Sequence, residues 1–203
     1  GGGVYFTDLT PESGELLLAN AIIDGNYANQ GGGGIYTQGA LLVTNSTVRN
    51  NEASNGGGIY INSGNLRMTN SLVANNNTSS RGAVYNNGVF HAVNSTIASN
   101  ESFGIYMTDS TLVRAELFNT IVASNRGVDI WQGDYATLTG FHCLIGNGDW
   151  QAGVFTNTHI GTTEDPHEPF ADPDSSDFRL LEGSLASDSG ATALAVYPDA
   201  TPI

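Results

Sequence analysis

Acidic side chains offer this sequence its main route to catalysis, because two facing carboxylates can cleave a glycosidic bond. In the repeated part of the sequence, the carboxylates fall at different positions of the repeat, so no two are expected to face each other on adjacent turns. The candidates are Asp24, Glu52, Glu101, Asp109 and Glu116. The sequence also contains no lysine, a common base of polysaccharide lyases. We therefore predict no catalytic residues and a protein that is not an enzyme.

A second group of acidic residues lies near the C-terminus, where an oxygen-rich loop would suit Ca²⁺. The candidate ligands are Asp172, Asp174 and Asp177. Their spacing does not match an EF-hand, and Asp-Pro and Asp-Ser are ordinary turn formers. The histidines show no spacing typical of metal ligands. The sequence thus requires no cofactor, with Ca²⁺ as the one candidate.

Aromatic residues could bind glycans through their ring faces. A tyrosine recurs at one position of the repeat, as Tyr36, Tyr60, Tyr85 and Tyr106. This column fits a structural stack or, if exposed, a stripe suited to sugars. Trp131, Tyr135 and Trp150 follow near the last turns, where they could bind sugars or cover the end of the core.

Two anchors place these side chains on a repeated unit. The first is a glycine-rich run before an apolar residue and a tyrosine, as at residues 32–36 and 56–60. The second is an asparagine followed by a short apolar stretch. Its copies begin at Asn20, Asn45, Asn70, Asn94 and Asn119, with His142 in the sixth copy, at spacings of 23 to 25 residues. This regularity predicts about six stacked turns over residues 1–146.

Between the anchors the residues alternate with a period of two, which is typical of strands. The residues four and two positions before each asparagine are apolar and should point inward. Each turn then holds three short strands, and successive turns lie about 4.8 Å apart. Since parallel crossovers are nearly always right-handed, we predict an all-β right-handed parallel β-helix, a solenoid with 24–25-residue turns. Residues 147–203 are expected to form an irregular segment that closes the same domain.

The asparagine column is expected to stabilise the fold. Identical side chains one turn apart can hydrogen-bond along the column, so we predict a buried structural ladder of Asn20, Asn45, Asn70, Asn94 and Asn119. Asn45 and Asn94 also begin Asn-Ser-Thr sequons. Burial in a ladder would make them poor glycosylation acceptors.

The first residues already match the glycine-rich anchor: Gly1, Gly2, Gly3, Val4 and Tyr5. We therefore expect the chain to start inside a turn, either as a processed or excised piece of a longer solenoid or with its end covered by another subunit. An uncovered strand edge pairs readily with another strand, so these residues are the candidate assembly interface. Head-to-tail contacts of this kind do not close, and they would build a filament.

Composition excludes several classes of protein. The 26 glycines, together with many Asn, Ser and Thr residues, argue against a helical fold. The net charge of −14 would repel nucleic acid. The single cysteine cannot form an intrachain disulfide. No apolar stretch reaches the length of a transmembrane helix.

The repeated Gly-Gly-Gly-Ile-Tyr and Asn-Ser-Thr-Val motifs resemble those of bacterial extracellular right-handed β-helix proteins, including polymorphic outer-membrane and adhesin-like solenoids. The C-terminal part resembles the choice-of-anchor Q β-helix proteins, through residues 118–123, 143–146, 172–173, 177–180 and 183–190. It departs from that pattern at Leu185, where proline is usual, and at Ser187, where isoleucine is usual. The resemblance covers essentially the whole chain. It implies an exported or surface-associated protein but no particular activity.

These observations favour a non-enzymatic extracellular or cell-surface solenoid that serves as a fibre, adhesin or matrix subunit. Its expected partner is a second copy of itself, stacked head to tail, or the flanking repeats of a longer chain. The alternative is a β-helix that binds or degrades polysaccharides. A groove lined by aligned carboxylates and aromatic rings would favour the alternative.

Overall fold

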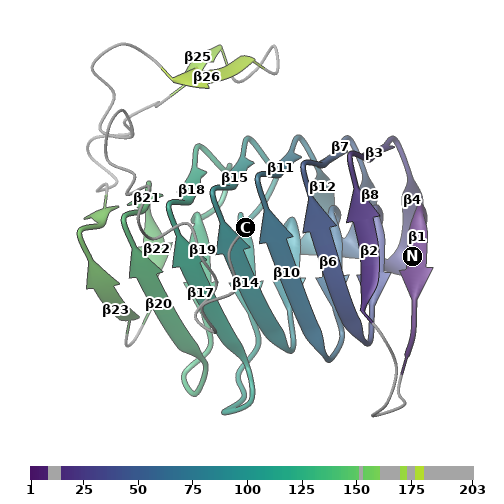
Figure 1. Ribbon diagram of the computed structural model, residues 1–203, viewed down its shortest axis with the longest axis horizontal. Coiled ribbons are helices and arrows are strands. Elements are labelled where there is room, and N and C mark those ends of the chain that lie inside the picture. The colour runs from purple at the N-terminus through teal and green to yellow at the C-terminus, as the bar shows by residue number, and fades with distance from the viewer. Residues whose placement is uncertain (9–14, 151–152, 161–169, 173–176, 181–203) are drawn as a thin grey trace.

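The computed structural model describes residues 1–8, 15–150, 153–160, 170–172 and 177–180. Over these ranges the chain winds into a parallel β-helix of short strands, with one antiparallel pair outside it (Figure 1). The described residues include no helix. Accordingly, none of them forms a helical segment long and apolar enough to cross a membrane.

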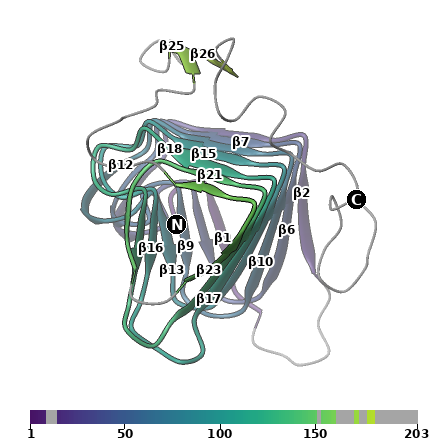
Figure 2. The ribbon, with the colours of Figure 1, turned by 90° about the vertical axis from the view of Figure 1, so that its left-hand side faces the viewer.

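Three parallel sheets of seven strands each form the walls of the β-helix (Figure 2). Sheet A contains β1 (Val4–Phe6), β5 (Ile35–Thr37), β9 (Ile59–Ile61), β13 (Val84–Asn86), β16 (Ile105–Met107), β19 (Ile130–Gln132) and β22 (Gly148–Asp149). Sheet B contains β2 (Leu16–Ala19), β6 (Ala40–Thr44), β10 (Asn65–Thr69), β14 (Val89–Val93), β17 (Arg114–Phe118), β20 (Thr137–Phe141) and β23 (Gly153–Thr156). Sheet C contains β3 (Ile22–Asp24), β7 (Thr47–Arg49), β11 (Leu72–Ala74), β15 (Thr96–Ala98), β18 (Ile121–Ala123), β21 (Leu144–Ile145) and β24 (His159–Ile160).

A shorter sheet D joins sheets C and A over three turns and contains β4 (Tyr27–Gly31), β8 (Glu52–Asn55) and β12 (Asn77–Arg81). The predicted all-β parallel solenoid is thus confirmed. The number of turns differs slightly from six, because each main sheet stacks seven strands. Strands β22 to β24 continue the stack to Ile160, beyond residue 146, where the repeat was expected to end.

The core is built from inward-facing columns that repeat once per turn. Sheet B contributes the apolar positions predicted from the alternation, and Leu41, Leu66 and Phe90 are fully buried in it. Sheet A adds an Ile/Val column, and sheet C adds a second one. These columns are Ile35, Ile59, Val84, Ile105 and Ile130, and Ile23, Val48, Val73, Ile97, Val122 and Ile145. Both faces of the alternation therefore lie as the sequence predicts.

Left-handed residues form the two corners that flank sheet C. The first corner is the asparagine column already noted, with φ between 47° and 53°, and the second contains Asn50, Asn75, Ser99 and Ser124. Asparagine tolerates this conformation better than most residues, because its short polar side chain can bond locally. The recurring asparagine of the repeat is thus explained by backbone geometry.

Glycine is required where the turns approach most closely. A Cβ on Gly33 would collide with the carbonyl oxygens of Gly57 and Glu52. The glycine-rich anchor therefore permits close stacking before each strand of sheet A.

An antiparallel pair lies outside sheet C (Figures 1 and 2). It consists of β25 (Phe170–Asp172) and β26 (Asp177–Leu180). Phe170 is buried against Ala98 and Ala123 on the outer face of sheet C. Phe178 packs edge-on against Phe170, with 5.4 Å between ring centroids. The described part of the C-terminal segment therefore covers the side of the solenoid.

Candidate functional site

Six outward-facing rings stack in one column along sheet A. We call this column the aromatic ladder: Tyr5, Tyr36, Tyr60, Tyr85, Tyr106 and Trp131. Neighbouring centroids lie 4.4 to 5.5 Å apart, and the planes are within 15° of parallel. The sequence predicted the tyrosine column but not its continuation through Tyr5 and Trp131. The in-register pairing of the strands brings all six rings together.

Burial raises the pKa of three phenols in the aromatic ladder, those of Tyr36, Tyr60 and Tyr106. Burial, and then the neighbouring Tyr85 and Tyr36, raise the pKa of Tyr60 to about 12. Burial also raises the pKa of Tyr106, although the Arg81 guanidinium opposes this shift. That guanidinium lies 5.1 Å from the centroid of the Tyr106 ring. The outer edge of the ladder can therefore donate hydrogen bonds.

Stacking decides what the ladder can bind. Each interior ring has a neighbouring ring on both faces, so it presents only its edge and its hydroxyl outward. A sugar that packs its C–H groups against a ring needs an open π face. The interior of the ladder is therefore a structural stack, and open faces can occur only at its ends.

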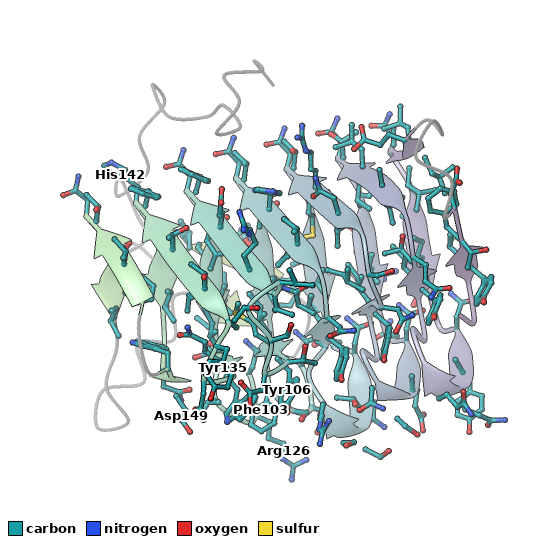
Figure 3. All side chains as sticks on the ribbon, turned by 90° about the horizontal axis from the view of Figure 1, so that it is seen from below. Phe103, Tyr106, Arg126, Tyr135, His142 and Asp149 are labelled. Atoms are coloured by element: carbon teal, nitrogen blue, oxygen red, sulfur yellow. The ribbon has the colours of Figure 1, made fainter. Side chains whose placement is uncertain are left out.

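Two loops between sheets A and B project beside the C-terminal part of the ladder. They span residues 108–113 and 133–136, and they expose Leu112 and Tyr135. The Tyr135 backbone N–H donates to Asp109 Oδ1 at 3.1 Å, which ties the two loops together. Figure 3 shows Tyr106, Tyr135 and Asp149 on the same side of the molecule, away from His142.

A charged row crosses the outer face of sheet B, and the sequence did not single it out. Arg67, His91 and Glu116 occupy the same position on successive strands. His91 Nδ1 lies 3.3 Å from Glu116 Oε2, and this contact is an ion pair when the imidazole is protonated. The strand alternation places this position outward, because the positions on either side of it point inward. The signal for the row was that its residues share a position, three residues before the asparagine of their repeat.

The carboxylates weighed as catalytic candidates do not face one another. Contrary to the expectation, Glu52 and Glu101 share one position of the repeat, but the turn of Asn77 lies between them. Asp24 on sheet C pairs with Arg49, and Glu101 pairs with Arg126. Glu52 lies on sheet D and Asp109 in a loop, so the structure does not bring these carboxylates together as facing pairs.

The structure describes only part of the candidate Ca²⁺ site. Asp172 and Asp177 are opposite each other in the β25–β26 pair, whereas Asp174 lies outside the described residues. Among the residues that are described, no group of three or more His, Cys, Asp and Glu side chains could hold a metal ion. Ca²⁺ binding therefore stays a prediction.

The structure contradicts the predicted burial of the first asparagine column. Asn20, Asn45 and Asn70 are exposed at the left-handed corner. One amide bond within the column is found, from Asn119 Nδ2 to Asn94 Oδ1 at 3.1 Å. The corner conformation, which sends the side chain outward, is the physical reason. The burial argument against glycosylation at Asn45 accordingly fails.

A different asparagine column forms the buried ladder. We call it the amide ladder: Asn26, Asn51, Asn76, Asn100 and Asn125. In each step an Nδ2 donates to the Oδ1 of the next turn at 2.8 to 3.1 Å, and the same Oδ1 accepts a backbone N–H. Each member follows its corner asparagine by six residues. The sequence therefore shows both asparagine columns at the same period, but the buried ladder was predicted for the first column and not for this one.

The amide ladder ends on a buried carboxylate. Asp129 Oδ1 accepts the Asn125 backbone N–H at 3.0 Å and its Nδ2 at 2.7 Å. Asp129 Oδ2 accepts the Asn147 backbone N–H at 2.8 Å. An acceptor-only group thus satisfies the last donors of the ladder.

A hydroxyl column runs directly after the first asparagine column, and its side chains bond to the carbonyl two residues earlier. Its members are Ser46, Ser71, Ser95, Thr120, Cys143 and Thr158. Cys143 therefore takes the place of a hydroxyl, with its Sγ 3.3 Å from the Phe141 carbonyl oxygen. The thiol serves packing and local bonding.

Cys143 is expected to resist alkylation in the folded protein. Burial raises its pKa from 9.0 to about 11. Because only the thiolate reacts, iodoacetamide at pH 8 should label the native thiol about 100-fold more slowly than the unfolded one, or slower still. The native rate should rise as the pH approaches 11. Mass spectrometry of timed samples, with the chain in denaturant as control, measures both rates, and equal rates would contradict the prediction.

The candidate assembly interface lies at one end of sheet A. Val4 and Tyr5 belong to β1, which pairs in register with β5, and the glycines before them bond to Gly32 and Gly33. In the described structure β1 is the last strand of sheet A on this side.

A family model described as "Right handed beta helix region" matches residues 13–142, which is more than half of the chain. No curated protein and no solved structure matches the chain significantly. The matched region covers the turns that carry the amide ladder and most of the aromatic ladder. The chain therefore belongs to the right-handed β-helix family.

Proposed function

We propose that this chain is a non-enzymatic structural solenoid that acts outside the cell or at its surface, as part of a fibre, an adhesin or a matrix. The observation that carries the proposal is the continuity of its ladders. The amide ladder and the aromatic ladder pass from turn to turn without interruption. Identical contacts at each step make a stiff rod, which suits a load-bearing or spacing role. A closer relation to the bacterial choice-of-anchor Q and outer-membrane solenoids is part of this proposal.

The rod is proposed to extend by stacking a further turn on β1. The Val4 N–H donates to the Gly34 carbonyl, and the Phe6 carbonyl accepts from the Gln38 N–H. Alternate residues of a parallel strand bond to opposite sides, so the backbone of Tyr5, between them, faces away from β5. Such an edge pairs readily with another strand, supplied by a second copy or by flanking repeats.

Replacing Tyr5 by proline is expected to abolish head-to-tail filaments. Proline removes the N–H that faces the outer edge while leaving the bonds from Val4 and Phe6 to β5 in place. Negative-stain electron microscopy across salt and Ca²⁺ concentrations should show thin filaments of the original chain and short rods of the Tyr5→Pro variant.

Tyr5→Ala is the matched control, because it removes the same ring but keeps the N–H. It should still form filaments. Two results would contradict the homopolymer: dispersed short rods of the original chain under every condition, or filaments that persist in Tyr5→Pro.

A second function, glycan binding, is favoured by a separate observation. Only the ends of the aromatic ladder can have an open ring face, and the loops that project beside its C-terminal end expose Tyr135. Rings with polar handles are common in sugar-facing surfaces, because they combine an apolar face with hydrogen-bonding groups. Asp24, Glu101 and Glu116 each lie against a basic side chain, so the described part of the solenoid gives no support to a polysaccharide-degrading form.

A further inference from the structure

The aromatic ladder stops at a carboxylate. Trp131 stacks on Tyr106 with 4.4 Å between centroids and 3° between planes, the tightest step of the ladder. On the next strand of sheet A, Asp149 is in register with Trp131. The seventh outward position of the column therefore holds an exposed carboxylate where each earlier strand has a ring.

The Trp131 indole has a fixed orientation that suits stacking by a ligand ring. Its face toward Tyr106 is covered, and that contact fixes the plane of the ring. Its other face points along the column toward the strand of Asp149, and the described residues place no further stacked ring there. Because strands stack about 4.8 Å apart, a ring at the seventh position would lie at normal stacking distance from the indole.

From this geometry we infer that a neutral pyranose stacks on Trp131, beside the Asp149 side chain that occupies the seventh position of the column. Its C–H face packs on Trp131, and its hydroxyls donate to the Asp149 carboxylate. Tyr135 flanks the same side of the molecule, in a loop that the bond to Asp109 holds in place (Figure 3). This site rests on the second proposed function, glycan binding, and gives it a location.

Local charge selects the class of sugar. Asp109, Asp134 and Asp149 are all exposed around this end of the ladder. Carboxylates accept hydrogen bonds from sugar hydroxyls, but they repel the carboxylates of uronic acids. The site therefore favours a neutral sugar over an acidic one.

The test uses the intrinsic fluorescence of Trp131. The chain has two tryptophans, so a Trp150→Phe background leaves Trp131 as the only indole that reports. A glycan array of neutral and acidic oligosaccharides selects the probes. The best neutral oligosaccharide and a trigalacturonate are then titrated. We expect a saturable change in Trp131 fluorescence with the neutral sugar and none with trigalacturonate.

Two variants locate the site. Trp131→Ala should abolish binding on the array, and Asp149→Ala should weaken it roughly tenfold or more, because hydrogen bonds to a charged group contribute about 1.5–3 kcal/mol each. Asp149 is exposed, so its variant keeps the fold even if Trp131→Ala does not, and circular dichroism checks both. Binding by the original chain that survives in both variants would overturn this site and leave glycan binding in place. No binding to any glycan would overturn both the site and the proposed glycan binding. Binding of acidic sugars alone would overturn the proposed neutral-sugar site and leave glycan binding in place.

Discussion

Asn76→Ala is expected to lower the free energy of unfolding by about 4 kcal/mol, since it leaves several buried polar groups without partners at about 1–3 kcal/mol each. Asn76 is fully buried at the centre of the amide ladder. Its Oδ1 accepts the backbone N–H and the Nδ2 of Asn51. Its own Nδ2 donates to Asn100 Oδ1 and to the Val48 and Ala74 carbonyls.

Urea denaturation followed by circular dichroism measures this loss, and calorimetry should show a fall in Tm of roughly 10 °C. Asn70→Ala is the matched control. Asn70 is exposed at a corner with φ 48°, so alanine there costs only the strain of a left-handed residue, about 1–2 kcal/mol. A smaller loss in Asn76→Ala than in Asn70→Ala would contradict the assignment of the amide ladder.

Asp129→Ala should be comparably damaging, with a loss of about 4 kcal/mol, because three buried N–H donors lose their acceptor. Two of these donors belong to Asn125 and one to Asn147. The stability of Asp129→Asn should lie between that of the original chain and that of Asp129→Ala. The new amide keeps an oxygen toward Asn125 but places an N–H against the backbone N–H of Asn147.

The same urea denaturation ranks the free energies of unfolding of the original chain, Asp129→Ala and Asp129→Asn. Asp134→Ala is the control for charge, since it removes one negative charge from an exposed position and should change stability by less than about 0.5 kcal/mol. Stability of Asp129→Asn equal to that of the original chain would show that the carboxylate is not needed to end the ladder.

The fold could be predicted because its signal is repeated. Nearly every turn places apolar residues at the same inward positions, so a period of two within strands and of 23 to 25 residues between them was enough. The stacking of the tyrosines followed from the same register. Side chains that depend only on strand register were therefore predictable.

The choice between the two asparagine columns was not predictable from spacing. Asn45 and Asn51 belong to columns with the same period, and asparagine suits both a left-handed corner and a side-chain ladder. The left-handed residues Asn45 and Asn50 turn the chain at two corners, and after the second one the Asn51 side chain points into the interior, where its Nδ2 donates to the Ile23 carbonyl. Burial at a bend depends on the dihedral angles of that bend, and the residue type alone does not set them.

The charged row and the end of the aromatic ladder were missed for another reason. Arg67, His91 and Glu116 differ in type, so a search for identical residues passes over them even though they share a position. Asp149 likewise breaks the aromatic pattern. Candidate sites on a solenoid lie where the repeat is broken, and a break becomes informative only once the register is known.

The amide ladder also has a direction, because every Nδ2 donates toward the next turn and the series ends at Asp129. Every joint between Asn26 and Asn125 is chemically alike, so the gene could gain or lose a whole repeat there by unequal recombination without creating a new kind of contact. Beyond Asp129 no such freedom exists, since a carboxylate has no hydrogen to pass on. The acid therefore terminates the series of side-chain amides, and a repeat inserted after it would have to begin a new one.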